Sequence, residues 1–101
     1  MKNFTDTDFA NEIQSGIVVV DFYADWCQPC RLLSSTFTKV SSSFSDVKFG
    51  KLDIDNNPEV TDKYKISSLP TILIFKDGVV IEKITGLVKE TVLSSAIKNV
   101  A

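Results

Sequence analysis

The sequence contains no histidine and only two cysteines among its 101 residues. The absence of histidine excludes a histidine-based catalytic triad and a zinc site with imidazole ligands within this chain. Its four glycines are scattered along the chain, and no Gly-rich phosphate loop of the Walker or dinucleotide type occurs. We therefore expect no bound cofactor and no metal.

The chain also lacks a strong charge of one sign and a long apolar stretch. Its formal net charge is −2, whereas a nucleic-acid-binding protein needs a concentrated basic face to neutralise phosphates. The longest apolar runs, such as residues 17–20, fall far short of the roughly 20 apolar residues that form a membrane helix. No basic segment followed by an apolar stretch is visible at the N-terminus, so we expect no signal peptide and a reducing, cytoplasmic location. Neither nucleic acid nor a membrane is an expected partner.

The length and composition are those of one globular domain, residues 1–101. Hydrophobic residues make up 44% of the chain and charged residues 24%, which is ordinary for a globular protein. Domains commonly run to about 100–150 residues, so there is no room for a separate substrate domain.

The spacing of the apolar residues predicts the element order βαβαβαββα. Strands are expected at 3–4, 17–23, 47–54, 71–75 and 79–81, and helices after a cap at Thr5 or Asp6, from Pro29 to Phe44, after Asn57-Pro58 and from about Lys89. Helices between the early strands imply parallel pairing, and the Asp77-Gly78 pair implies a late antiparallel hairpin. The expected fold class is α/β: a three-layer α/β/α sandwich with a mixed, mainly parallel central sheet.

The sharpest local signal is Trp26-Cys27-Gln28-Pro29-Cys30, between a predicted buried strand and a helix start. Pro29 fits the first turn of a helix, where its missing N–H costs nothing. The free N–H groups and aligned peptide dipoles at a helix start favour a thiolate, the form that attacks disulfides. Cys27 lies just before that turn and Cys30 one turn inside, on the same face. We expect Cys27 to be the exposed nucleophile and Cys30 the more buried resolving thiol.

Three other interpretations of the cysteine pair are weaker. A zinc site needs about four ligands, and only two thiols are present. A structural disulfide would close a tiny loop, which restrains the unfolded chain little. Unreactive buried cysteines are common singly, but not as a pair at this spacing between a strand and a helix.

Asp21 lies inside the apolar run of residues 17–23. A buried carboxylate is costly unless it is protonated or paired, so we expect its pKa to be raised. Such a carboxyl can take the proton from Cys30 as that thiol attacks a mixed disulfide. Lys51, on the next predicted strand, is the candidate neighbour that would tune it. The competing interpretations place Asp21 in a solvent-filled gap at the strand end and Lys51 on a solvated strand edge.

Pro70, Trp26 and Gly86 each admit a functional and a structural interpretation. From the residues alone, a trans Pro70 opening a strand is the better expectation. A cis bond would instead bend the chain and present the Leu69 backbone to a substrate strand. Trp26 is either a contact for partners or a core residue. Gly86 either permits close approach of another backbone or serves a turn.

Several motifs in the right order make the chain resemble the thioredoxin family along essentially its whole length. The segments that carry the resemblance are Asp21–Arg31, Lys51–Pro58, Leu69–Thr71 and Phe75–Gly78. A CxxC motif alone would be a weak signal, whereas these segments at the spacing of the family are highly specific.

The resemblance implies a thioredoxin fold and a general protein-disulfide reductase that cycles Cys27 and Cys30 between dithiol and disulfide. By position it implies catalytic roles for Asp21 and Lys51, and a cis bond at Pro70. It also implies a substrate-binding surface made of Trp26, Gln28, Pro29, Leu69, Pro70 and Gly86. The implied partners are oxidised proteins and an NADPH-dependent thioredoxin reductase, whose cofactor belongs to the reductase. We expect the protein itself to be a monomer.

Two positions depart from the family pattern. Gln28 stands where the family usually has glycine, and a bulkier polar residue there can alter partner choice or redox potential. Ser35 stands near the position where the family often has a proline, so the helix kink of the family has no proline to cause it here.

Two other functions use the same motif or the same fold. A disulfide oxidase or isomerase would run the exchange in the opposite direction, but the missing signal peptide and the proline before Cys30 argue against it. A binding module would use the fold only as a docking platform, and it would not need the intact cysteine pair.

Overall fold

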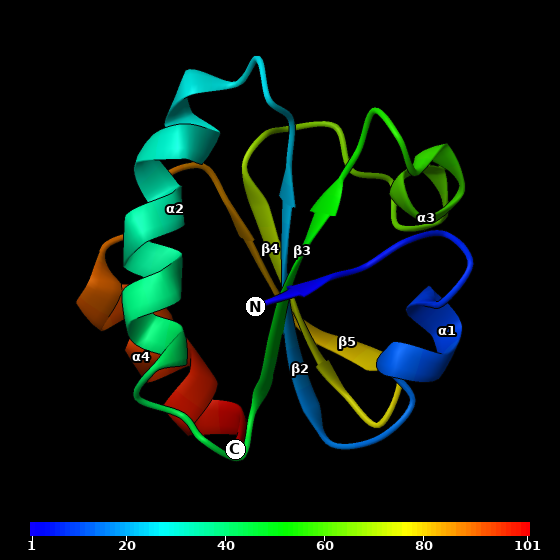
Figure 1. The fold of residues 1–101 in the computed structure, drawn as a ribbon. Coiled ribbons are helices and arrows are strands. Elements are labelled where there is room, and N and C mark those ends of the chain that lie inside the picture. The colour runs from blue at the N-terminus through cyan, green and yellow to red at the C-terminus, as the bar shows by residue number, and fades with distance from the viewer.

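The structure, a computed structural model, describes residues 1–101 and is built around a five-stranded sheet. The strands are β1 (Lys2–Asn3), β2 (Ile17–Tyr23), β3 (Lys48–Asp53), β4 (Thr71–Lys76) and β5 (Val79–Thr85). The helices are α1 (Phe9–Glu12), α2 (Gln28–Ser41), α3 (Pro58–Lys63) and α4 (Glu90–Val100). The predicted element order is confirmed, and so is the three-layer arrangement: α2 and α4 cover one face of the sheet, and α1 and α3 the other (Figure 1). None of the helices is long and apolar enough to cross a membrane.

The sheet is mixed, with the strand order β1-β3-β2-β4-β5. β3 pairs in parallel with β1 and β2, whereas β4 pairs antiparallel with β2 and β5. Because β4 is antiparallel to both of its neighbours, it alone runs against the other four strands, and the expectation of a mixed, mainly parallel sheet is confirmed.

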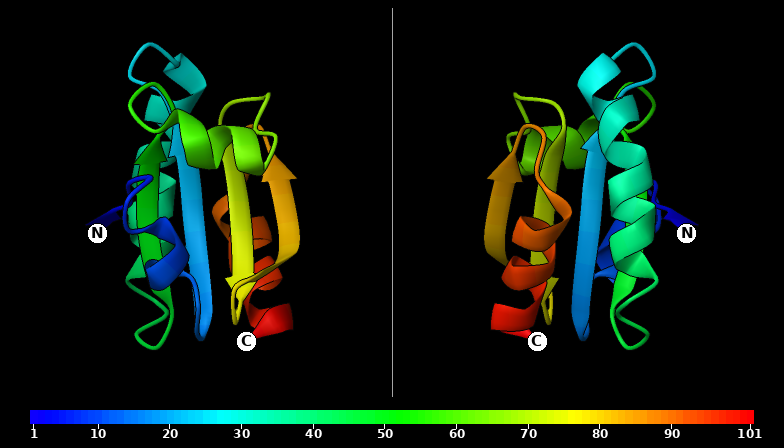
Figure 2. Two further views of the ribbon diagram at one scale, coloured as in Figure 1. Left: turned by 90° about the vertical axis from the view of Figure 1, so that its right-hand side faces the viewer. Right: turned by 90° about the vertical axis from the view of Figure 1, so that its left-hand side faces the viewer.

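The lengths of the connecting helices explain the direction of β4. α2 has 14 residues, about 21 Å of helix, which is enough to carry the chain back along the sheet. α3 has six residues, about 9 Å, and cannot do so. α3 stays at the end of the sheet where β3 finishes (Figure 2). The chain consequently enters β4 from that end and runs the opposite way.

β2 is the central strand, and its side chains alternate between two cores. Val18, Val20 and Phe22 pack in the cluster beneath α1 and α3, whereas Val19 packs in the cluster beneath α2 and α4. Alternation along the strand places Asp21 on the same face as Val19, which is the face covered by α2. The apolar run of β2 therefore buries this carboxyl directly beneath the helix that begins with the cysteine motif.

Asp6 links the N-terminal segment to α3. Its Oδ1 accepts a hydrogen bond from the Val60 backbone N–H at 2.9 Å, and its Oδ2 accepts one from Glu59 N–H at 3.1 Å. Asp6 thus satisfies the free donors at the start of α3, which the N-cap residue Asn57 does not reach. The prediction of a cap at Thr5 or Asp6 is confirmed for Thr5: Asp8 is the N-cap of α1 by its bounds, but it makes no side-chain cap hydrogen bond, and its own N–H donates to Thr5 Oγ1 at 3.3 Å.

Candidate active site

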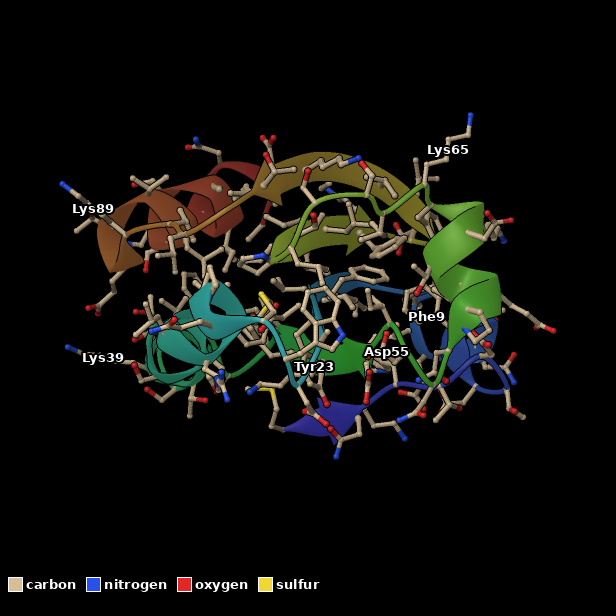
Figure 3. The ribbon with its side chains drawn as sticks, turned by 90° about the horizontal axis from the view of Figure 1, so that it is seen from above. Phe9, Tyr23, Lys39, Asp55, Lys65 and Lys89 are labelled. Atoms are coloured by element: carbon tan, nitrogen blue, oxygen red, sulfur yellow. A yellow bond between two sulfur atoms is a disulfide. The ribbon has the colours of Figure 1, made fainter.

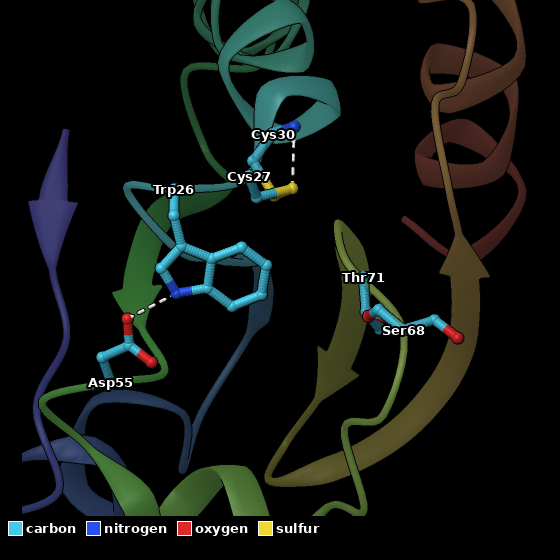
Figure 4. Close-up of a disulfide and its surroundings, with 6 residues drawn as sticks. All are labelled: Trp26, Cys27, Cys30, Asp55, Ser68 and Thr71. Atoms are coloured by element: carbon cyan, nitrogen blue, oxygen red, sulfur yellow. Dashed lines mark hydrogen bonds between the residues drawn. A yellow bond between two sulfur atoms is a disulfide. The ribbon is translucent and has the colours of Figure 1, made fainter.

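The two cysteines lie at the junction of β2 and α2, where the parallel strands end. Cys27 is the N-cap of α2, and Cys30 is its third residue. They form a disulfide with their Cα atoms 5.3 Å apart. The backbone N–H of Cys30 donates a hydrogen bond to Cys27 Sγ at 3.2 Å (Figure 4). This donor belongs to the first turn of the helix, so it is placed to stabilise negative charge on Cys27.

Both cysteines are buried in this disulfide form. The exposed fraction is 5% for Cys27 and 4% for Cys30, so the prediction that Cys27 is exposed is wrong for this state. Cys27 packs in a cluster with Ala24 and Cys30, and Tyr23, Ile54 and Leu69 pack against that cluster. The two residues differ instead in what they border, because Cys27 lines a surface groove and Cys30 lines a separate cavity.

The groove beside Cys27 has a volume of about 420 Å³. Its lining is made of Trp26, Cys27, Gln28, Pro29, Ile54, Ile66, Ser67 and Leu69. Four residues of the predicted substrate-binding surface therefore come together here. Ile54, Ile66 and Ser67 were not singled out in the sequence, because they come from the segments after β3 and after α3, which only the fold brings to the cysteine motif.

The Leu69–Pro70 peptide bond is cis. The residues alone favoured a trans bond, and the family resemblance implied the bond that is found. Gly86 does not line the groove. It adopts a φ of +82°, which favours glycine, and its N–H donates to the Pro70 carbonyl at 2.8 Å. The hydrogen bond from Gly86 therefore fixes the position of the turn at Pro70.

Trp26 is a surface residue with 67% of its area exposed, which excludes the core interpretation. Its indole Nε1–H donates to Asp55 Oδ2 at 2.8 Å (Figure 4). Tyr23 and Asp55 lie at this same end of the sheet, seen from above in Figure 3. Asp55 follows β3, and its hydrogen bond fixes the position of the Trp26 ring, which lines the groove. No local pattern indicates this contact, because the partners are 29 residues apart.

Asp21 is fully enclosed, with an exposed fraction of 1%. Its Oδ1 has no hydrogen-bond partner. Burial raises the pKa of this carboxyl from 3.8 to about 6, and the positive charge of Lys51 opposes part of the rise. The interpretation of Asp21 as a solvated residue at a strand end is therefore excluded, and its predicted pKa shift is confirmed in direction.

Lys51 stands directly opposite Asp21 in the register of β2 and β3. Both residues line a cavity of about 360 Å³ together with Cys30 and Ser34. The ammonium group donates to Ser34 Oγ at 2.6 Å and lies 5.8 Å from the centre of the Tyr23 ring. The prediction that Lys51 lies near Asp21 is borne out, and Ser34 is an addition that the sequence did not indicate.

The site combines a disulfide at a helix start, an open groove on one side of it and a buried carboxyl on the other. No group of three or more cysteine, aspartate or glutamate side chains is arranged to hold a metal ion. The chemistry available to the cysteines is the exchange of disulfides through a thiolate, and the Asp21 carboxyl lines the same cavity as Cys30. These features define a dithiol–disulfide oxidoreductase.

Comparison with known proteins identifies the family. The family model described as Thioredoxin matches residues 1–99. A thioredoxin from Chlamydia pneumoniae is 36% identical over 99 residues, which span 98% of this chain and 97% of that protein. The oxidised form of mitochondrial thioredoxin 3 from Saccharomyces cerevisiae superposes with a TM-score of 0.90 at 36% identity, covering 98% of this chain and 94% of that one. The chain belongs to the thioredoxin family.

Because the family match spans residues 1–99, the activity of the family applies to this chain. The protein is a protein-disulfide reductase of the thioredoxin type, and its Cys27–Cys30 pair is the redox-active centre. Its substrates are disulfides of other proteins, and a reductase restores the dithiol.

Proposed function

We propose that Cys27 is the nucleophile of this reaction and Cys30 the resolving thiol. The Cys27 thiolate attacks one sulfur of a substrate disulfide, forms a mixed disulfide and releases the other substrate sulfur as a thiolate. Cys30 then attacks Cys27 Sγ, which closes the Cys27–Cys30 bond and releases the second substrate thiol. Two electrons pass to the substrate. The observation that supports this order is the position of Cys27 as the N-cap, with the Cys30 N–H on its sulfur.

Asp21 is the proton acceptor for Cys30 in the second step. The two residues line the same cavity, and a carboxyl with a pKa of about 6 is largely ionised near pH 7 yet still takes up a proton readily. Lys51 tunes this carboxyl through its charge.

The groove receives an extended segment of the substrate. The backbone N–H and carbonyl of Leu69 have no hydrogen-bond partner within the chain. Both groups are therefore free to pair with a substrate strand. Trp26, Gln28 and Pro29 form the facing wall, and Pro70, held by Gly86, shapes the turn. The amide of Gln28, the first residue of α2 and exposed, adds a polar contact next to the attacking sulfur.

The electron donor is an NADPH-dependent thioredoxin reductase, and the protein works as a cytoplasmic monomer formed by one domain, residues 1–101. A pair that must be reduced to act suits a reducing compartment. With purified reductase and the oxidised protein, we expect NADPH absorbance at 340 nm to fall until one NADPH is consumed per protein molecule. Absence of consumption with an active reductase would contradict this electron source, and light scattering of the purified chain checks the monomer.

Asp21→Asn tests the proton acceptor. The amide cannot take up a proton at neutral pH, so we expect the resolving step to slow about 10- to 100-fold and its dependence on an ionisation near pH 6 to disappear. Stopped-flow measurement of substrate thiol release between pH 5 and 9 reports both changes. An unchanged pH profile would remove Asp21 from the mechanism. Asp46→Asn, an exposed aspartate outside the site, is the control.

The same substitution is expected to stabilise the fold. The carboxyl has a pKa of about 6 in the folded chain against 3.8 ordinarily. The unfolded chain therefore loses the proton first as the pH rises, so stability is greatest below pH 4, falls up to about pH 6 and then stays low. Two pKa units correspond to about 3 kcal/mol, which Asp21→Asn recovers in part at pH 7 but not at pH 4. Urea unfolding of the variant and the wild type at pH 4 and pH 7 checks this. If the two proteins differ in their free energy of unfolding by the same amount at both pH values, the prediction is contradicted.

A further inference from the structure

Ser34 lies one helical turn after Cys30 on α2 and is half-buried against the cavity. Its Oγ accepts a hydrogen bond from the Lys51 ammonium at 2.6 Å. Residues four apart share a face of a helix, so Ser34 sits on the same side of α2 as the resolving cysteine. Nothing in the reaction described so far uses its hydroxyl.

Lys51 has a second possible acceptor close by. It stands opposite Asp21 in the paired strands and shares a cavity with it, and Asp21 Oδ1 has no partner. The ion pairs of the molecule nevertheless include neither of these residues. The ammonium is bound to the serine hydroxyl, although an unpaired carboxyl oxygen lines the same cavity.

Lys51 is the charge that controls the ionisation of Asp21, although other ionisable groups also line this cavity. Tyr23 comes from β2, Asp25 from the segment after it and Arg31 from α2, while β4 places the apolar Ile72 opposite Asp21. Burial, and then the charges of nearby carboxylates, raise the pKa of Tyr23 above its ordinary value of 10.0, so it stays neutral at working pH. Lys51 is the only charge found to act on Asp21. Its distance from that carboxyl therefore decides how strongly the charged form is favoured.

We propose that Ser34 is a positioning residue that holds the Lys51 ammonium away from Asp21 and so keeps that carboxyl able to take the proton from Cys30. This rests on the proton-acceptor role of Asp21 proposed above. Without the hydroxyl, the ammonium loses its acceptor and turns to the unpaired oxygen of Asp21. An ion pair there favours the carboxylate and makes it a weaker base.

The test compares Ser34→Ala with Ser35→Ala, which removes an exposed hydroxyl from the next position of the same helix. Alanine is the better helix former, so both variants are expected to keep α2. The measurement is the titration of the Asp21 side-chain carboxyl carbon by NMR in the oxidised protein. We expect its midpoint to fall by about one pH unit in Ser34→Ala, as for a carboxyl that gains a cation within about 4–6 Å. Ser35→Ala should leave the midpoint in place, and Ser34→Thr, which keeps a hydroxyl, should restore it.

A double variant shows whether Ser34 acts through the lysine. Lys51→Met removes the cation, so the Asp21 midpoint should rise, and adding Ser34→Ala to Lys51→Met should then change nothing further. An unmoved midpoint in Ser34→Ala overturns the proposal. A shift that persists in the absence of Lys51 also overturns it.

The rate of mixed-disulfide resolution, measured against pH in the same variants, separates the two proposals. If the acid limb of the pH–rate profile shifts to lower pH together with the Asp21 midpoint in Ser34→Ala, both the role of Ser34 and the role of Asp21 are supported. If the midpoint moves and the rate profile does not, Ser34 positions Lys51 as inferred, but Asp21 is not the proton acceptor.

Discussion

Replacement of Cys27 by serine is expected to lower the rate of protein-disulfide reduction at least about 1000-fold. Disulfide exchange needs an ionised sulfur, and a hydroxyl in the same place stays protonated at neutral pH. The Cys30 N–H that meets Cys27 Sγ in the native chain would meet a neutral oxygen instead. The substitution therefore removes the attacking atom and leaves the groove and the helix start in place.

The assay couples reduction of insulin to NADPH consumption through thioredoxin reductase. Serine is a favoured N-cap residue, so α2 is expected to keep its start, and the urea midpoint of the variant should match that of the reduced wild type. Ser43→Ala, an exposed serine beyond the end of α2, is the control. Activity within tenfold of the wild type in the folded variant would mean that Cys27 is not the nucleophile.

The position of the cysteine pair was predictable because every signal for it is local. The apolar run of β2, the proline in the first turn of α2 and the three-residue spacing of the cysteines lie within one stretch of chain. A strand, a helix start and a shared helix face follow from such patterns without knowledge of the rest of the molecule. Asp21 was identified for the same reason, since a carboxylate stands out within an apolar strand.

The contacts that complete the site depend on register between distant segments. Ser34 contacts Lys51 only because the rotation of α2 about its own axis turns Ser34 towards β3. Trp26 contacts Asp55 only because the segment after β3 turns towards the groove. An amphipathic pattern indicates which face of a helix is buried but not which residue lies opposite. These two hydrogen bonds join residues 17 and 29 positions apart, and no sequence pattern indicates either.

The direction of β4 could not be predicted from the presence of a helix before it. A parallel connection requires a helix long enough to return along the sheet, and α3 is too short for that. The antiparallel entry brings Pro70 to the same end of the sheet as the cysteines. The groove therefore depends on a feature of the topology, the length of α3, that the pattern of apolar residues did not reveal.

Replacement of Cys30 by serine is expected to convert the protein into a trap for its substrates. The hydrogen bond to Cys27 Sγ comes from the backbone N–H of residue 30, so it survives the substitution. Cys27 therefore still attacks, but no thiol remains to displace the substrate, and the mixed disulfide accumulates. Intact-mass spectrometry after mixing with an oxidised protein should show a covalent one-to-one adduct that dithiothreitol releases.

The comparison with Cys27→Ser makes this experiment decisive for the order of attack. That variant retains only the Cys30 thiol, which borders the cavity lined by Asp21 and Lys51 rather than the substrate groove. We expect it to form the adduct at least about 100 times more slowly than Cys30→Ser, because its sulfur lacks both the N-cap position and access to the groove. The variant with both cysteines replaced should form none. If the two single variants react at equal rates, the helix start does not select the attacking sulfur and the assignment of roles fails.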